Sequence, residues 1–182
     1  MFRCTRENRS QISRGRIVLR AKQYDSIHIL LVDDDEGDAL LAQLAIEQVD
    51  YPIQLSHVLD GVEAIAFLNR QSPYLDVQTP DLILLDLNMP RMGGHETLVA
   101  IKSDPRFATI PVVVMTTSNA ARDISRSYDA NANCYISKPM ELSDFMDTIV
   151  SLADFWCRGT TQFPTNGNFS APNSGTEANA TI

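Results

Sequence analysis

The chain contains few of the features that mark a secreted or membrane-bound protein. Its three cysteines form no CxxC pair and adjoin no histidine pattern, so the sequence indicates neither a disulfide framework nor a zinc site. No apolar run approaches the roughly 18 residues that a membrane-spanning helix needs. The first residues also lack the apolar segment of a secretory signal. These absences favour a cytoplasmic protein without a membrane partner.

The charge of the chain is acidic overall but unevenly distributed. The net charge is -8, yet residues 1–25 hold seven basic and two acidic residues, so the remaining chain carries -13. Phosphate contacts with nucleic acid depend on Lys and Arg. A strongly acidic body therefore disfavours a nucleic-acid partner.

The two ends of the chain differ in composition from its centre. We interpret residues 1–25 as a basic disordered arm or a misassigned start, with a partner tether or a transit peptide as alternatives. Residues 159–182 are rich in Thr, Asn, Gly, Ser and Pro and almost uncharged, which predicts a disordered polar tail. Residues 26–158 are then expected to form one folded domain.

Short apolar runs alternate with helix-like segments between these ends. Strands are predicted at residues 27–32, 53–58, 81–86, 111–116 and 134–137, and helices at 37–49, 61–70, 94–103, 120–130 and 141–157. Such alternation is typical of βαβ units, whose crossovers are right-handed. The sequence therefore predicts an α/β fold, with a doubly wound, five-stranded parallel sheet in a three-layer αβα sandwich.

Apolar residues in the first and last predicted helices recur at helical spacing. We expect each set to lie on one face and to pack on the sheet. The first set is Leu40, Leu41, Leu44, Ala45 and Val49, and the second is Leu142, Phe145, Ile149, Leu152 and Trp156.

Four of the apolar runs stop at residues that suit phosphoryl transfer. The first ends at Asp33 and Asp34, and the others end at Asp86, Thr116 and Lys138. In open parallel sheets, ligands bind beyond the carboxyl ends of the strands. We therefore expect three carboxylates, a hydroxyl and an ammonium to gather at one edge.

This expected edge has a defined chemistry. Asp33, Asp34 and Asp86 would repel one another unless a cation neutralised them, and a site of few carboxylates suits Mg²⁺. Lys138 and Thr116 could bind phosphate oxygens. A carboxylate can itself act as the nucleophile and form an aspartyl phosphate. Asp86 is the best candidate, because it ends the most apolar run.

Four sequence segments carry a specific resemblance. The segments ILLVDDDEGDALL, DLILLDLNMPRMGGHE, PVVVMTTS and CYISKP resemble the signature segments of the receiver domain of two-component response regulators, over residues 27–157. The resemblance implies the flavodoxin-like strand order 2-1-3-4-5. It also implies Asp86 as the phosphoacceptor. The metal ligands would be Asp33, Asp34, Asp86 and the backbone carbonyl of Asn88, Lys138 would pair with the phosphate before a cis bond to Pro139, and Thr116 and Tyr135 would be the switch pair.

A finer resemblance concerns the partners. The segments VLDGVEAIAFL and SYDANANCYISKP and the terminal Phe155–Trp156 are similar to single-domain regulators that partner cyanobacterial phytochrome histidine kinases. This implies phosphorylation by a histidine kinase, a bacteriophytochrome among the candidates, and signalling through a protein target that the sequence does not identify. It implies no enzyme activity beyond the chain's own phosphoryl transfer and autodephosphorylation, and no organic cofactor. Phe155 and Trp156 could form a homodimer surface on the last helix.

Simpler interpretations stay open at this point. Acidic residues such as Asp33, Asp34 and Asp35 often cap a following helix, and Tyr135 could be a plain core aromatic. A phosphorylation-independent scaffold is one alternative function. An aspartyl-phosphate phosphatase is another, although that chemistry wants a second acid where Asn88 stands. A transcription factor is disfavoured, because no helix-turn-helix follows the resembling segment.

Overall fold

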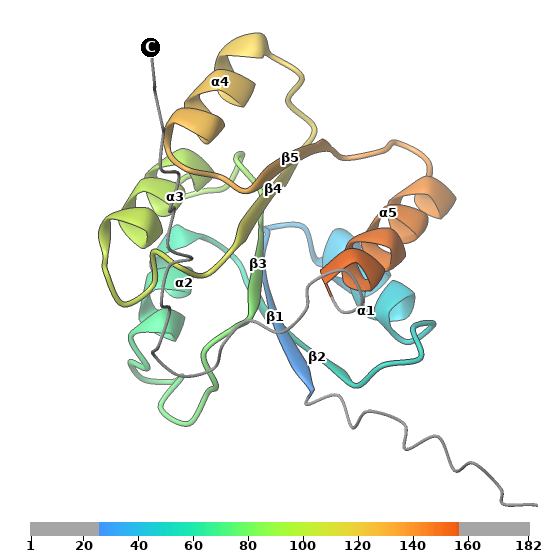
Figure 1. Ribbon diagram of the computed structural model, residues 1–182, viewed down its shortest axis with the longest axis horizontal. Helices are drawn as coiled ribbons and strands as arrows, with labels where there is room; N and C mark the ends of the chain where they lie inside the picture. The colour runs from blue at the N-terminus through green and yellow to red at the C-terminus, as the bar shows by residue number, and fades with distance from the viewer. Residues whose placement is uncertain (1–25, 157–182) are drawn as a thin grey trace, which may run out of the picture.

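The computed structural model describes residues 26–156, and the segments expected as a basic arm and a polar tail lie outside these described residues. Five strands alternate with five helices along the chain (Figure 1). The strands are β1 (Ile27–Val32), β2 (Ile53–Val58), β3 (Leu82–Leu85), β4 (Val112–Thr116) and β5 (Cys134–Ser137). The helices are α1 (Glu36–Ile46), α2 (Gly61–Leu68), α3 (Gly94–Ser103), α4 (Ala121–Asp129) and α5 (Leu142–Asp154).

All five strands form one parallel sheet in the order β2-β1-β3-β4-β5. The predicted α/β class and the flavodoxin-like strand order are therefore confirmed. The register aligns the ends of neighbouring strands: Val32 pairs with Leu85, and Thr116 pairs with Ser137. Because the ends are aligned, the residues that follow β1, β3, β4 and β5 meet at one edge.

Helices cover both faces of the sheet and make the expected three layers. In Figure 1, α2, α3 and α4 lie on one side of the strands, and α1 and α5 lie on the other. Successive residues of a strand point to opposite faces, so Leu30 and Val32 of β1 enter the core beneath α2 and α3, whereas Ile29 and Leu31 enter the core beneath α1 and α5. β3 is buried along its whole length, as a central strand must be.

The apolar face predicted for α1 is wrong in part. Leu40 and Leu44 are 60% and 43% exposed, and the helix instead buries Ala42, Ala45 and Ile46. These three buried residues have the i, i+3, i+4 spacing of a single helical stripe. Because two of them are alanines, α1 can lie close to the sheet and to α5, and that orientation turns the bulky leucines outward.

The face predicted for α5 is largely confirmed. Phe145 and Ile149 are buried, and Leu152 and Trp156 pack partly buried against the same core. Leu142 is the exception, since it is 64% exposed in the first turn of the helix. No helix among the residues described is both long and apolar enough to cross a bilayer.

Candidate functional site

The carboxyl edge of the sheet brings together the side chains that the sequence predicted to meet there. Asp33 follows β1, Asp86 follows β3, Thr116 ends β4 and Lys138 follows β5. All four residues are buried. Buried charges are rarely tolerated unless they are paired, so the edge must be understood through its ion pairs.

Asp86 is held by the chain that follows it. Its carboxylate oxygen Oδ1 accepts hydrogen bonds from the backbone N–H groups of Leu87 (2.6 Å) and Asn88 (3.2 Å). The other oxygen, Oδ2, accepts a hydrogen bond from Lys138 Nζ at 3.0 Å. The two carboxylate oxygens are therefore not equivalent: the loop fixes one, and the other faces an ammonium group.

Lys138 is the cation at the centre of the site. Its Nζ lies 2.7 Å from Asp33 Oδ2, 2.8 Å from Asp38 Oδ2 and 3.0 Å from Asp86 Oδ2. Burial alone would lower the pKa of the Lys138 ammonium, but hydrogen bonds to Asp33 and Asp38 and the nearby carboxylate charges hold that pKa above its ordinary value. Lys138 therefore stays protonated.

Sequence reasoning missed the role of Asp38. Its place in the first turn of α1 suits favourable interaction of an acidic side chain with the helix dipole, which by itself would explain the residue. Only the packing of α1 against the sheet shows that the Asp38 carboxylate turns back to Lys138. A helical-wheel projection places Asp38 on the same face as Ala42 and Ala45, but the sequence does not show that this is the face of α1 that packs against the sheet.

The three acidic residues before α1 have separate roles in the structure. Asp35 is the helix cap, because its side chain accepts hydrogen bonds from the backbone N–H groups of Gly37 (2.7 Å) and Asp38 (3.4 Å). The capping interpretation thus applies to Asp35, whereas Asp33 points into the site. Asp34 is exposed at the rim.

Asp33, Asp34 and Asp86 can hold a divalent metal ion. One oxygen from each carboxylate lies within 4.8 Å of the others. Burial raises the pKa of the Asp33 carboxyl, and the neighbouring Asp86 charge acts in the same direction, against the opposing effect of Lys138. An all-oxygen set with an exposed member leaves room for water ligands, which suits a hard cation.

The expected switch residues lie beside the acidic pocket. The Thr116 hydroxyl accepts a hydrogen bond from the Asn88 side-chain amide at 3.3 Å. The Tyr135 hydroxyl donates to the backbone carbonyl of Ser118 at 2.6 Å, and its ring packs partly buried on the core beneath α2 and α3. Burial raises the pKa of the Tyr135 phenol. Tyr135 is thus both a core aromatic and a contact of the loop after β4.

Gly94 allows α3 to begin directly against the phosphoacceptor loop. A Cβ atom at Gly94 would lie 2.1 Å from the Asp86 carbonyl oxygen and 2.6 Å from Leu87 Cα. The Gly94 N–H donates to the Leu87 carbonyl at 3.0 Å. The sequence alone does not show this contact, because a close approach of two backbone segments that are separated in the chain leaves no local pattern.

His57 is a second contact of the site that sequence reasoning missed. Its Nε2 lies 2.8 Å from the backbone carbonyl of Asp33, so the ring N–H donates to that oxygen and steadies the β1–α1 connection. The histidines are scattered along the chain, and no local pattern marks His57. Its role depends on the pairing of β1 with β2.

The expectation about Pro139 is corrected by the structure. The bond before Pro139 is trans, which corrects the expectation of a cis bond there; the one cis peptide bond among residues 26–156 joins Ser72 and Pro73. The trans isomer is the intrinsically favoured form of an X–Pro bond. Phe155 and Trp156 are not part of the acidic edge, because they follow α5 at its far end.

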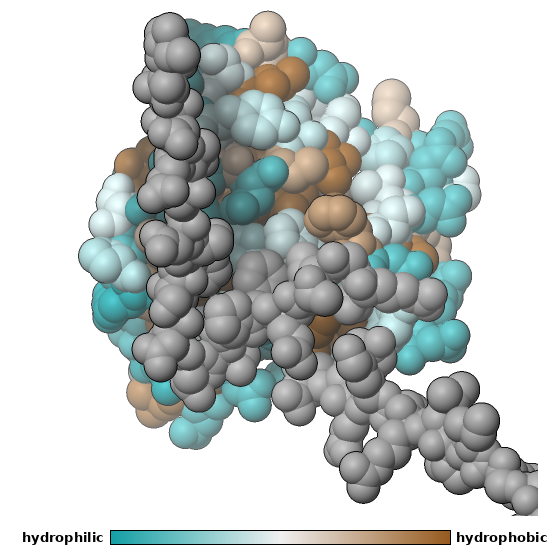
Figure 2. Space-filling model, viewed as in Figure 1, coloured by the Kyte–Doolittle hydropathy of each residue, from teal (hydrophilic) through white to brown (hydrophobic). Residues whose placement is uncertain are grey.

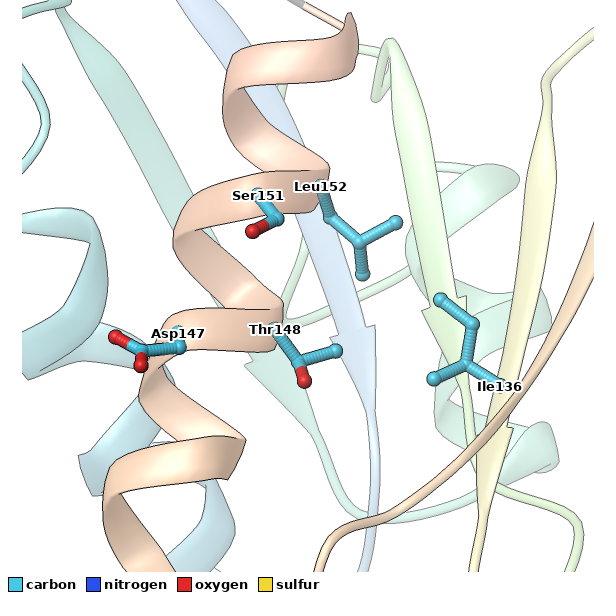
Figure 3. A pocket seen from close by; sticks show the side chains of 5 residues that line it. All are labelled: Ile136, Asp147, Thr148, Ser151 and Leu152. Atoms are coloured by element: carbon cyan, nitrogen blue, oxygen red, sulfur yellow. The ribbon is translucent and has the colours of Figure 1, made fainter.

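The surface around α5 has a pocket of its own. It has a volume of about 310 Å³ and lies between β5 and α5, and Figure 3 shows Thr148 and Leu152 extending from α5 toward Ile136. Figure 2 shows hydrophobic surface in the middle of this side of the molecule, between α4 and α5. Phe155, three residues after the pocket residue Leu152, is 61% exposed. Its ring contacts that of Trp156 edge to face with a centroid distance of 5.4 Å.

A doubly wound sheet with acids and a lysine at its carboxyl edge has a counterpart among known proteins. The response regulator receiver domain matches residues 29–150, and the chain belongs to this family. The predicted membership of the family is thereby confirmed. Proteins of this family are generally not enzymes beyond their own phosphoryl transfer.

The most similar relatives include phytochrome-associated regulators. Response regulator Rcp1 of Synechocystis sp. is 39% identical over 133 residues, which cover 73% of this chain and 90% of Rcp1. The structure of the phosphorylated cyanobacterial phytochrome response regulator RcpA superposes with a TM-score of 0.73 at 42% identity, covering 75% of this chain and 98% of RcpA. The Mn²⁺-bound form of Rcp1 superposes with a TM-score of 0.71 at 38% identity, covering 74% and 97%.

Proposed function

We propose that the chain is a response regulator that a sensor histidine kinase phosphorylates on Asp86. The observation that carries this proposal is the asymmetry of the Asp86 carboxylate. Oδ1 is occupied by the N–H groups of Leu87 and Asn88, so Oδ2 is the oxygen available to attack a phosphoryl group. Lys138, 3.0 Å from Oδ2, carries the charge that offsets the repulsion between a carboxylate and an incoming phosphoryl dianion.

We propose Mg²⁺ as the metal of this site. Asp33, Asp34 and Asp86 would hold it together with the backbone carbonyl of Asn88, and their separation and oxygen chemistry support this. When bound, Mg²⁺ supplies positive charge next to the phosphoryl oxygens. The chain's own contribution is to hold Asp33 and Asp86 together, which Lys138 does through its ion pairs with both carboxylates.

The response to phosphorylation is proposed to run through Thr116 and Tyr135. A phosphoryl group adds negative charge and strong acceptor oxygens beside the Thr116 hydroxyl. The hydroxyl would then move away from the Asn88 side-chain amide and donate a hydrogen bond to a phosphoryl oxygen. Movement of the loop after β4 would then break the hydrogen bond between Tyr135 and the Ser118 carbonyl. The surface formed by α4, β5 and α5 would change as a consequence.

The partner is proposed to be a phytochrome histidine kinase, and the response is proposed to pass to a protein target. The names of the relatives support the first part: RcpA is a phytochrome response regulator, and RtBRR, 32% identical with a TM-score of 0.61, is a bacteriophytochrome response regulator. The receiver unit is proposed to span residues 26–158. Its action is proposed to be cytoplasmic, without nucleic acid or membrane as a partner.

A homodimer through α5 is part of the same proposal. Phe155 is exposed directly after α5, the pocket between β5 and α5 includes Ile136 and Leu152 in its lining, and large aromatic side chains often anchor interfaces. Phosphorylation on Asp86 would alter β5 through Tyr135 and so favour this contact.

The proposal is tested by incubating the chain with a small acyl phosphate and Mg²⁺ and measuring the intact mass. One phosphoryl adduct is expected on the wild type and none on Asp86→Asn. The matched control Glu36→Gln changes an exposed acid of the same charge and should keep the adduct. Absence of an adduct on the folded wild type would favour a phosphorylation-independent scaffold instead.

A further inference from the structure

Three carboxylates surround the Lys138 ammonium. An ammonium group offers three N–H donors; Asp33 and Asp86 accept hydrogen bonds from Nζ, and the Asp38 carboxylate forms an ion pair with it at 2.8 Å. A phosphoryl oxygen on Asp86 must therefore compete with these carboxylates for the Lys138 contact. The proposed function already assigns a role to Asp33 and Asp86, but not to Asp38.

Asp38 differs from Asp33 in how easily it can give up Lys138. The Asp38 side chain is 25% exposed, whereas that of Asp33 is 1% exposed. A partly solvated carboxylate loses less when its ion pair breaks, because water replaces the lost contact. Asp38 also stands on a fixed support, since Asp35 caps the first turn of α1 and accepts from the Asp38 N–H.

We propose that Asp38 is a positioning residue that holds the Lys138 ammonium in the site and yields it to the phosphoryl group. This inference rests on the proposed phosphorylation of Asp86. Asp38 adds a negative charge at the metal-binding edge, and it competes with the phosphoryl group for the same ammonium. It therefore favours the metal-loaded state before phosphorylation and opposes the phosphorylated state.

Substitution Asp38→Asn should consequently affect two ligands in opposite directions. Loss of one negative charge next to the acidic edge should weaken Mg²⁺ binding about tenfold. At saturating Mg²⁺, the anionic phosphoryl mimic beryllofluoride should bind about threefold more tightly, because repulsion falls and one charged competitor for Lys138 becomes neutral. Isothermal titration calorimetry measures both affinities on the same samples. A merely structural role would weaken both.

Glu36→Gln is the matched control for charge. Glu36 is an exposed acid in the same first turn, and it makes no ion pair with Lys138. If the contact with Lys138 matters, Glu36→Gln should shift each affinity by less than half as much as Asp38→Asn. Equal shifts in the two variants, or a shift of both ligands in the same direction, would overturn the inference.

A readout without metal separates this inference from the proposed function. In nuclear magnetic resonance of the metal-free chain, the Lys138 ammonium protons should exchange with water at least several-fold faster in Asp38→Asn, because the neutral amide oxygen of asparagine holds an ammonium N–H more weakly than the Asp38 carboxylate does. Unchanged exchange would overturn the role of Asp38. Failure of the wild type to bind beryllofluoride would instead overturn the phosphorylation of Asp86, while the exchange experiment would still decide whether Asp38 holds Lys138.

Discussion

At the residue scale, the acids of the carboxyl edge are distinguished by their hydrogen-bond partners. Asp35 binds backbone N–H groups of its own helix, Asp38 binds a lysine, and Asp86 divides its oxygens between a loop and that lysine. Residue type alone does not separate these roles. Each depends on which donor the fold places within about 3 Å of the oxygen.

Gly94→Ala should destabilise the chain, although alanine is ordinarily preferred to glycine in a helix. The new Cβ would lie 2.1 Å from the Asp86 carbonyl oxygen, so the backbone of the phosphoacceptor loop would have to shift. We expect a loss of about 2 kcal/mol in the free energy of unfolding, measured by urea denaturation.

Gly93→Ala is the control for this substitution. A Cβ at Gly93 would lie 3.5 Å from the Leu87 carbonyl oxygen, an ordinary contact, and the backbone φ of -72° suits any residue. Its effect should stay within about 0.5 kcal/mol. Equal effects of the two substitutions would show that the close approach of α3 to Asp86 does not limit stability.

His28 should make the stability of the chain depend on pH. Burial lowers the pKa of the His28 imidazole from 6.5, against the opposing charge of Asp81. The unfolded chain therefore binds the proton first as the pH falls through 6.5, and stability is lost from there down to the lower pKa of the folded state. The ring nitrogen Nε2 contacts Ser56 Oγ at 2.8 Å, on β2.

The matched measurement compares the wild type with His28→Gln by urea denaturation at pH 7.5 and pH 5.5. Between these values the wild type should lose more free energy of unfolding than the variant. The difference should reach at most about 1.4 kcal/mol for each pH unit over which His28 is protonated in the unfolded chain but neutral in the folded chain. The carboxyl groups contribute equally to both proteins. A wild type that loses no more than His28→Gln would refute the prediction.

At the scale of the elements, the connection between β4 and α4 links the acidic edge to the surface formed by α4 and β5. Ser118 donates from its hydroxyl to Asp123 at 2.6 Å, and its carbonyl accepts from Tyr135. Thr116, two residues earlier, lies within the reach of Asn88. The loop is therefore held from both ends, which makes it the natural element to transmit a change at Asp86.

Tyr135→Phe tests this connection. The ring remains to pack on the core, and only the hydrogen bond to the Ser118 carbonyl is lost, so stability should fall by about 1 kcal/mol. Phosphoryl uptake, measured by intact mass, should persist because Tyr135 makes no bond to Asp86. The backbone chemical-shift changes that beryllofluoride causes in α4 should shrink. Loss of the phosphoryl adduct itself would contradict the assignment of Tyr135 to the response rather than to the acceptor site.

The elements and the acidic edge could be predicted from the sequence because both depend on local pattern. Apolar runs define strands, and parallel strands gather whatever follows their carboxyl ends. The contacts of Asp38 and His57 could not be predicted, since each joins side chains that are distant in sequence through a helix orientation or a strand pairing. The error over Leu40 and Leu44 has the same origin: helical spacing gives a stripe, but the alanines decide which stripe approaches α5.

At the scale of the whole molecule, α5 joins the acidic edge to the proposed dimer surface. The N-terminal end follows Lys138 and the acidic edge, and the C-terminal end carries Phe155 and Trp156. If the proposed dimer is correct, a signal that begins at Asp86 must pass along α5 to Phe155 and Trp156 to reach the second copy of the chain. The distance between the ends is that of one 13-residue helix.

Phe155→Ala tests the dimer. In light scattering with Mg²⁺ and beryllofluoride, the wild type should show a larger mean mass than Phe155→Ala, since the substitution removes an exposed aromatic anchor. Leu40→Ala removes a side chain of similar exposure from α1, on which the proposed dimer does not depend. A wild type that stays monomeric, or a Leu40→Ala variant that loses mass as Phe155→Ala does, would contradict the dimer through α5.

The most direct test of the central claim identifies the phosphorylated residue chemically. After incubation with an acyl phosphate and Mg²⁺, borohydride reduces an aspartyl phosphate to homoserine, which tandem mass spectrometry locates in the chain. We predict homoserine at position 86 alone, because Asp86 is the proposed phosphoacceptor with its Oδ2 3.0 Å from Lys138, whereas Asp33 and Asp34 are proposed to hold the metal. Homoserine at Asp33, Asp34 or Asp38, or none at any position, would contradict the account.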